Sequence, residues 1–303
     1  MDLLQPDTWA EALTAKAEQP GLLPIAGGTD VMVEINFDRR RPAGLLDLTR
    51  IDEIATWSVE DGGVRIGAGV TYAQVESDLG ELLPALAMAS RTVGSPQIRN
   101  RGTVAGNLGS ASPAGDAHPP LLAAGATVEL ESVRGRRLVP VADFFVGVKR
   151  NALDPDELIR AVRVPVTGGP QQFAKIGTRN AMVIAVASFA LALHPAARRV
   201  GTGIGSAAPT PRRAPTAEVL LAGELDWDGR APLGASVVRR FGELVAAAAD
   251  PIDDVRGSAS PAGDAVPRFP PIVPLLRICG EPTVRDASAS AGRTAVSSRI
   301  ASV

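Results

Sequence analysis

The apolar and polar positions at the start of the chain predict a small unit of alternating strands and helices. The predicted elements are a helix over 7–18, a strand over 22–26, a helix over 31–36 and a strand over 45–48. The first strand ends at Gly27 and Gly28, and Thr29 or Asp30 can cap the helix that follows. The glycines would then lie at the carboxyl end of a strand, where α/β sheets place ligands.

A second unit is predicted from residue 58 to 168, where strand and helix patterns surround a glycine-rich segment. The predicted elements are a strand over 64–68, helices from Thr71 and over 84–91, a helix over 119–126, strands over 127–132 and 138–141, and a loop with a short helix at 141–145. Arg134 and Gly135 would form the hairpin turn between the last two strands. The segment from 101 to 116 is predicted as one long loop.

A boundary is predicted at Gly168–Pro170, because two glycines and a proline interrupt the pattern there. The elements predicted beyond it are strands over 171–176, 183–194 and 199–204 and helices over 216–221 and 233–249. They predict a third, α+β unit over 169–257, an antiparallel sheet covered by helices. Residues 258–303 are predicted as irregular or disordered, since 261–303 hold six prolines and little periodicity.

Composition excludes several classes of function but says little about the fold. A net charge of −2 gives no argument for nucleic acid, and no apolar run is long enough for a membrane span. No secretory leader is visible, so a cytoplasmic location is expected. Cys279 is the single cysteine and there are two histidines, which excludes an intrachain disulfide and argues against a metal site. Redox chemistry would have to come from a bound organic cofactor.

Two glycine-rich segments carry the clearest functional signal. Residues 24–30 read PIAGGTD, and residues 101–116 read RGTVAGNLGSASPAGD. Each can present backbone N–H groups to an anion, because glycine allows close approach and positive φ. The first segment lacks the Rossmann and P-loop patterns. Two such segments predict one long, doubly charged ligand, and of the dinucleotides FAD is favoured.

Side chains of the second segment add candidate contacts. Thr103, Asn107, Ser110 and Ser112 are short and polar, and the carboxylate of Asp116 suits ribose hydroxyls. Val104 and Leu108 are predicted to lie against an isoalloxazine ring. The nonapeptide GSASPAGDA at 109–117 recurs at 257–265, but a proline-rich stretch follows the second copy. That copy is therefore not expected to bind the cofactor.

Residues 1 to about 258 resemble the flavoprotein (medium) subunits of molybdenum hydroxylases, above all the FAD-binding subunits of bacterial xanthine dehydrogenases. The motifs that carry the resemblance are AGGTD at 26–30, QIRNRGTVAGNLGSASPAGDAHPPLLAAGATV at 97–128, KIGTRNAMVIA at 175–185, GIGSAAPTPRRA at 203–214 and PIDDVRGSA at 251–259. The resemblance implies an α+β fold. It consists of a two-subdomain FAD-binding domain of the PCMH/vanillyl-alcohol-oxidase type over 1–168, divided near residue 57, and a small α+β domain over 169–257.

The resemblance also implies a site. Backbone amides of the first segment would hold the FAD pyrophosphate through Ile25, Ala26, Gly27, Gly28, Thr29 and Asp30. Further contacts would come from Thr103, Gly106, Asn107, Ser110 and Ser112. Asp116 would bind the adenosine half, and Lys175 would lie beside the flavin ring and stabilise negative charge on it. The FAD would be held noncovalently, because neither a histidine nor a cysteine lies in the glycine motifs.

The implied activity is that of an oxidoreductase subunit. Substrate would be oxidised on a molybdopterin chain, and electrons would pass through an Fe–S chain to FAD here and on to NAD or oxygen. The alternatives are a self-contained flavin oxidase of the same fold and a noncatalytic FAD-binding module. The chain departs from the family at 180–183, where relatives carry acidic residues, and after Ser260, where they continue into a helix.

Overall fold

The structure is a computed structural model that describes residues 2–179, 181–229 and 231–250. The predicted tail at 258–303, the second GSASPAGDA copy, the 251–259 motif and Cys279 lie outside the described residues. Within the described ranges, no helix combines the length and apolar character needed to cross a membrane.

The first unit contains a three-stranded parallel sheet in the order β1-β3-β2. Its elements are β1 (Asp2–Leu4), α1 (Trp9–Glu18), β2 (Leu23–Ile25), α2 (Val31–Asn36) and β3 (Gly44–Asp47). The predicted strand–glycine–helix–strand order is confirmed, and β1 is an addition. A capping box between Thr8 and Glu11 begins α1. Asp30 is the N-cap of α2, but its side chain makes no capping hydrogen bond, so that detail of the prediction is wrong.

The second unit is built on a five-stranded antiparallel sheet, in the order β4-β5-β10-β6-β7. Its strands are β4 (Trp57–Glu60), β5 (Gly63–Gly67), β6 (Thr127–Ser132), β7 (Gly135–Pro140) and β10 (Leu158–Pro165), with a small ribbon of β8 (Phe145–Gly147) and β9 (Arg150–Asn151). Its helices are α3 (Tyr72–Asp78), α4 (Pro84–Arg91), α5 (Pro96–Arg99), α6 (Val104–Ser110), α7 (His118–Ala124) and α8 (Val141–Phe144). Sequence reasoning missed β10, the central strand.

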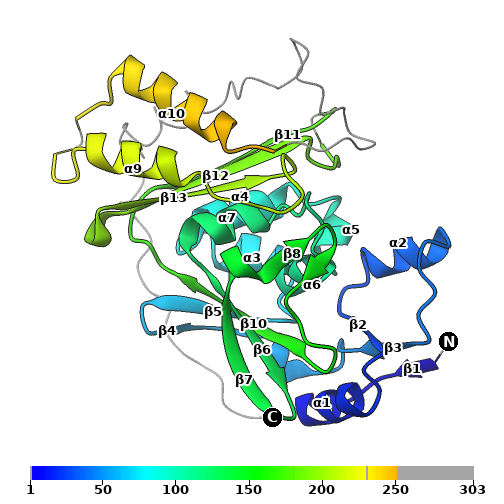
Figure 1. The fold of residues 1–303 in the computed structure, drawn as a ribbon. Coiled ribbons are helices and arrows are strands. Elements are labelled where there is room, and N and C mark those ends of the chain that lie inside the picture. The colour runs from blue at the N-terminus through cyan, green and yellow to red at the C-terminus, as the bar shows by residue number, and fades with distance from the viewer. Residues whose placement is uncertain (1, 180, 230, 251–303) are drawn as a thin grey trace, which may run out of the picture.

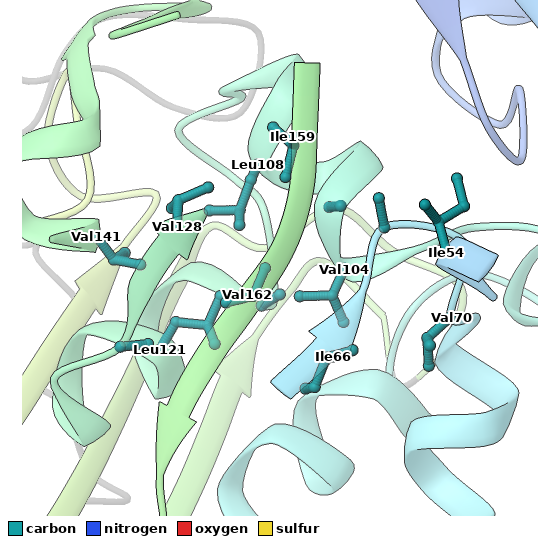
Figure 2. Packing of buried hydrophobic residues seen from close by; sticks show 14 of the residues in the cluster. Ile54, Ile66, Val70, Val104, Leu108, Leu121, Val128, Val141, Ile159 and Val162 are labelled. Atoms are coloured by element: carbon teal, nitrogen blue, oxygen red, sulfur yellow. The ribbon is translucent and has the colours of Figure 1, made fainter. Parts of the chain in front are cut away.

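Residues 101–116 are not one long loop, because α6 lies inside them. The Thr103 side chain caps this helix by accepting a hydrogen bond from the Gly106 N–H at 2.9 Å. Val104 and Leu108 point from α6 into the core, against Ile159 and Val162 of β10 (Figure 2). Both side chains are fully buried in that core, and neither lines the cavity described below. The prediction that they lie against an isoalloxazine ring is therefore wrong.

Helix α1 joins the first unit to this sheet through Trp9. The indole Nε1 donates to Glu131 at 3.0 Å, and the Trp9 backbone N–H donates to Glu53 at 2.9 Å. The Arg160 guanidinium of β10 lies 4.8 Å from the indole ring centroid and donates to Glu53 at 2.8 Å. Arg160, a charged residue of β10, thus has the Trp9 ring and the Glu53 carboxylate as partners.

The third unit is a three-stranded antiparallel sheet of β11 (Gln171–Ile176), β12 (Ala187–His194) and β13 (Arg199–Gly205). Helices α9 (Pro215–Glu224) and α10 (Ala235–Ala247) cover one face, and α4 and α7 lie against the other (Figure 1). The antiparallel sheet is confirmed, but 183–186 precede β12 instead of forming part of it. A division into domains at residue 168 stays a prediction.

The two faces of this sheet carry side chains of very different size. Phe189, Leu191 and Leu193 of β12 pack in one cluster with α9 and α10, whereas Ala190 and Ala192 pack with Ala123 of α7 and Ala85 and Ala89 of α4. On β13 the corresponding positions are glycines. A Cβ on Gly201 would overlap the Ala123 carbonyl oxygen, and one on Gly203 would overlap the Pro119 carbonyl oxygen. The backbone of α7 therefore lies directly on the strand.

Replacing Gly203 by alanine is expected to lower the free energy of unfolding by about 1–3 kcal/mol, the usual cost of overpacking a dense contact. Urea unfolding of the purified variant would measure it. Gly242→Ala on α10 is the matched control, because a Cβ there meets nothing within 4 Å. That change should leave stability unchanged or raise it, since alanine favours a helix. Equal stability of Gly203→Ala and the parent chain would contradict the close contact.

Candidate functional site

The two glycine-rich segments lie against each other. A Cβ on Gly27 would overlap the carbonyl oxygen of Arg101, so the first segment packs on the backbone of the second with no room for a side chain. Gly28 has φ of +73°, a conformation that side chains disfavour. A Cβ there would lie 3.2 Å from Ile25 of the same segment and 3.3 Å from Met32 of α2. Gly27 therefore allows the close contact between the two segments, and Gly28 allows the turn within the first segment.

A cavity of about 720 Å³ opens along this contact. Every residue predicted for the site lines it: Ile25, Ala26, Gly27, Gly28, Thr29, Asp30, Thr103, Gly106, Asn107, Ser110, Ser112, Asp116 and Lys175. The third unit reaches the same cavity through Lys175 of β11 and the 182–184 segment that follows it. The structure thus brings together residues from all three units, and their contact with a ligand stays a prediction.

Most of the polar side chains in the second segment already have backbone partners. Asn107 Oδ1 accepts from the Ala117 N–H at 3.3 Å, and Ser110 Oγ donates to the Asn107 carbonyl at 2.9 Å. Ser112 Oγ accepts from the Ala114 N–H at 3.4 Å. Together with the Thr103 cap of α6, these bonds fix the path of the segment. These side chains therefore shape the loop, and the residues that carry them also line the cavity.

Asp116 and Lys175 form a buried ion pair at the wall of the cavity. Lys175 Nζ donates to Asp116 Oδ2 at 2.6 Å and to the Thr92 carbonyl at 3.2 Å. Their side chains are only 9% and 8% exposed, respectively. Burial raises the pKa of the Asp116 carboxyl, and the Lys175 ammonium opposes that rise.

This contact bears on the predicted roles of Asp116 and Lys175, which both stay predictions. Asp116 was assigned to the adenosine half of FAD and Lys175 to the flavin ring, yet their charged atoms are 2.6 Å apart. An extended dinucleotide cannot place its opposite ends at one ion pair. A ligand that contacts both residues must contact them with the same end, and a separation of 59 positions in the chain gave no sign of their pairing.

Two polar atoms at the cavity are buried and lack a hydrogen-bond partner among the described residues. They are Asp116 Oδ1 and the hydroxyl of Tyr72. Tyr72 is 4% exposed, lies at the first turn of α3 and lines the cavity. An unpaired buried polar atom is costly, so such atoms indicate where a ligand supplies the missing partner. Sequence reasoning did not assign Tyr72 to the site, and its only signal was being the single tyrosine.

His118 follows the second segment but does not belong to the cavity wall. Its ring is fully buried, and burial lowers the pKa of His118 to about 4. The ring is therefore neutral, with Nε2 3.1 Å from the Asn107 carbonyl and the ring centroid 4.5 Å from that of Phe145. A Cβ on Gly115 would overlap this ring. His118 thus supports the segment from behind.

The mouth of the cavity carries both charge and apolar surface. Lys149 pairs with Glu34 of α2, and both residues line the opening. Lys149 lies in the turn of the β8–β9 ribbon, with φ of 54°. Two further lining residues, Met182 and Ile184, are 57% and 66% exposed. None of the described lining residues is a histidine or a cysteine.

Comparisons with known proteins agree with this architecture. Residues 1–167 match the family described as "FAD binding domain in molybdopterin dehydrogenase". The nicotinate dehydrogenase FAD-subunit of Eubacterium barkeri is 40% identical in a match that covers 54% of this chain and 57% of that subunit. The putative xanthine dehydrogenase FAD-binding subunit of Escherichia coli is 33% identical over 70% of this chain and 75% of that protein. This chain thus spans little more than half of the first relative.

The solved structures extend the likeness beyond the matched domain. A chain of carbon monoxide dehydrogenase from Hydrogenophaga pseudoflava superposes with a TM-score of 0.77 at 25% identity, over 92% of this chain and 93% of that one. A chain of quinoline 2-oxidoreductase from Pseudomonas putida 86 has the same TM-score of 0.77 at 22% identity, which shows the fold alone. The α+β fold is shared along most of the chain.

Breaking the Asp116–Lys175 pair is expected to destabilise the chain even without ligand. Lys175→Met leaves a buried carboxylate without its cation, which costs about 3–5 kcal/mol. The double variant Asp116→Asn/Lys175→Met should recover most of that loss, because no charge stays buried. Urea unfolding of the ligand-free chain would measure both.

Arg240 provides the control for this experiment, because it pairs with Glu243 at 3.0 Å on the surface, where the side chains are 61% and 53% exposed. Arg240→Met should change stability by less than about 1 kcal/mol. A Lys175→Met variant as stable as the Arg240→Met variant would show that the buried pair contributes no more to the free energy of unfolding than an exposed pair.

Proposed function

This chain belongs to the family of FAD-binding domains in molybdopterin dehydrogenases, and on that basis we propose that it passes electrons from a partner chain through FAD to NAD or oxygen. It is an FAD-binding subunit of the molybdenum-hydroxylase type. The observation that carries the proposal is the single cavity in which both glycine-rich segments and Lys175 meet. The acceptor, the partners and the substrate of the whole enzyme belong to the proposal.

The cavity fits FAD on three counts. Its volume of about 720 Å³ lies in the range of cofactor sites. The Gly27–Arg101 contact brings two glycine-rich backbones side by side, as binding of a pyrophosphate through amides requires. Asp116 Oδ1 and Tyr72 Oη supply an acceptor and a donor, which the hydroxyl groups of the cofactor can pair with. We propose noncovalent binding, with the backbone of 25–30 holding the pyrophosphate.

The residues of this chain would bind and tune the cofactor. FAD, when bound, supplies one- and two-electron redox chemistry. Lys175 would stabilise negative charge on the flavin ring, and Asp116 would hold the ammonium in place at 2.6 Å. Because the carboxylate neutralises much of that positive charge, Asp116 sets how strongly Lys175 acts on the ring.

The proposed partners follow from what the chain lacks. It holds one cysteine, too few for the thiolate ligands of an Fe–S cluster. We therefore place the clusters on one partner chain and the molybdopterin on another, in a cytoplasmic complex. The exposed apolar and charged mouth of the cavity is where NAD or oxygen would reach the flavin.

Gly27→Ala is expected to weaken FAD binding at least tenfold, because the methyl group forces the 24–30 segment away from Arg101. Titration of the FAD-free chain with FAD, followed by flavin fluorescence, would measure the dissociation constant. Gly21→Ala is the matched control, since a Cβ at Gly21 meets nothing within 4 Å. Normal FAD affinity in Gly27→Ala would contradict the assigned cradle.

The subunit role can be tested by anaerobic reduction of the FAD-loaded chain. The isolated chain should keep its flavin absorbance with xanthine or nicotinate, and NADH should bleach it slowly. Bleaching by the organic substrate should require the co-purified partner chains. Substrate turnover by the isolated chain would overturn the proposal in favour of a self-contained oxidase, and an absence of Fe–S and molybdopterin chains in native purifications would favour an FAD-binding module.

A further inference from the structure

The hydroxyl of Tyr72 is the polar group in the described cavity wall whose role is not explained by the fold. It is buried, and no described residue accepts or donates a hydrogen bond to it. Its helix begins with a complete capping box between Thr71 and Gln74, so the hydroxyl is not needed there. The Tyr72 backbone N–H donates to the Gly102 carbonyl at 2.9 Å. A phenylalanine would satisfy all of these contacts equally well.

Tyr72 lies close to the first glycine segment and lines the same cavity as the ion pair. A Cβ on Gly102 would lie 3.3 Å from Tyr72 Cδ2 and 3.3 Å from Thr29 Oγ1, so the aromatic ring and the 24–30 segment flank the same glycine. The carboxylates of Asp116 and Asp30 both act electrostatically on the Tyr72 hydroxyl. Tyr72 thus lies beside the 24–30 segment, in a cavity wall that also contains Asp30 and Asp116.

The surroundings fix the hydroxyl as a donor. Burial raises the pKa of Tyr72 well above its usual value, and the negative charges of Asp116 and Asp30 raise it further. The group stays protonated throughout the physiological range. In the same cavity wall, Asp116 Oδ1 is an acceptor without a partner in the described part of the chain.

An unpaired donor and an unpaired acceptor in one cavity wall favour a particular ligand group. A hydroxyl can accept from Tyr72 and donate to Asp116 at the same time, whereas a phosphate oxygen can only accept. A phosphate would also be repelled by the carboxylates of Asp116 and Asp30. In FAD, hydroxyl groups stand between the pyrophosphate and the flavin ring on the ribityl chain. That order matches the proposed cradle at 25–30 on one side and Lys175 on the other.

We propose that Tyr72 Oη and Asp116 Oδ1 together bind a hydroxyl group of the FAD ribityl chain, with Tyr72 as donor and Asp116 as acceptor. This inference rests on the proposed placement of the flavin ring beside Lys175. Tyr72 is then a cofactor-binding residue, and it fixes the distance between the phosphate cradle and the ion pair.

The test is a double-mutant cycle between Tyr72→Phe and FAD analogues that lack one ribityl hydroxyl. Tyr72→Phe should raise the dissociation constant of FAD about tenfold, the effect of one buried hydrogen bond. With the 2′-, 3′- or 4′-deoxyribityl analogue that lacks the paired hydroxyl, the same substitution should have little further effect. Flavin fluorescence during titration of the FAD-free chain gives each constant.

Additive effects with all three deoxyribityl analogues would overturn the inference. Coupling with FAD that lacks the 2′-hydroxyl of its adenosine ribose would also overturn it, because the hydroxyl would then face the other end of the cofactor. If the parent chain does not bind FAD, the proposed function fails as well. Normal FAD binding with an additive cycle would leave that function intact.

Two controls separate binding from folding. The urea midpoint of the FAD-free chain should not fall in Tyr72→Phe, since the hydroxyl has no partner among the described residues. A fall would show that the hydroxyl bonds to the protein, against the inference. Val75→Ala, one turn further along α3 at a buried position outside the cavity, should lower that midpoint and keep the ribityl coupling.

Discussion

The contact between α7 and β13 is the constraint on which the site depends. Gly201 and Gly203 let the helix backbone lie directly on the strand, so the third unit sits against the second at a short, fixed separation. Asp116 immediately precedes α7, and Lys175 lies on β11, the far strand of the same sheet. Side chains in place of these glycines would push the sheet outward and carry Lys175 away from its carboxylate. An ion pair at 2.6 Å leaves no slack for such a shift.

A second close contact acts on the opposite wall of the cavity. Gly27 packs on the Arg101 carbonyl and holds the parallel sheet of the first unit against the second. At both contacts, glycine stands where a side chain would keep the two backbones apart. The cavity is therefore the space left between three units whose separations are set by glycines, and the cofactor would bind to walls that are already in position.

Much of the fold could be predicted from local pattern. The helix at 84–91 and the strands at 127–132 and 171–176 have the predicted bounds, because their apolar spacing and flanking residues agree. Strand β10 was missed, since Arg160 and Arg163 interrupt its apolar run. Those arginines are matched by Glu53 and Glu129, acids from other elements that only the folded chain brings near. Helix α6 was missed because its glycines are typical of a loop. The Thr103 cap and the apolar face of Val104 and Leu108 were the signals for a helix.

The candidate site, like the fold, could be predicted only in part from the sequence. The thirteen predicted residues do line one cavity, because glycine-rich segments are a local signal that the sequence displays directly. Neither the pairing of Asp116 with Lys175 nor the place of Tyr72 can be obtained from spacing, since both depend on how three units pack. The polar side chains of the second segment also have a structural task that their chemistry alone did not reveal. Thr103, Asn107, Ser110 and Ser112 are bonded to nearby backbone and fix the shape of the loop. The motif is therefore better understood as specifying a backbone path. The same residues line the cavity, so a side chain that fixes the loop stays a candidate for ligand contact as well.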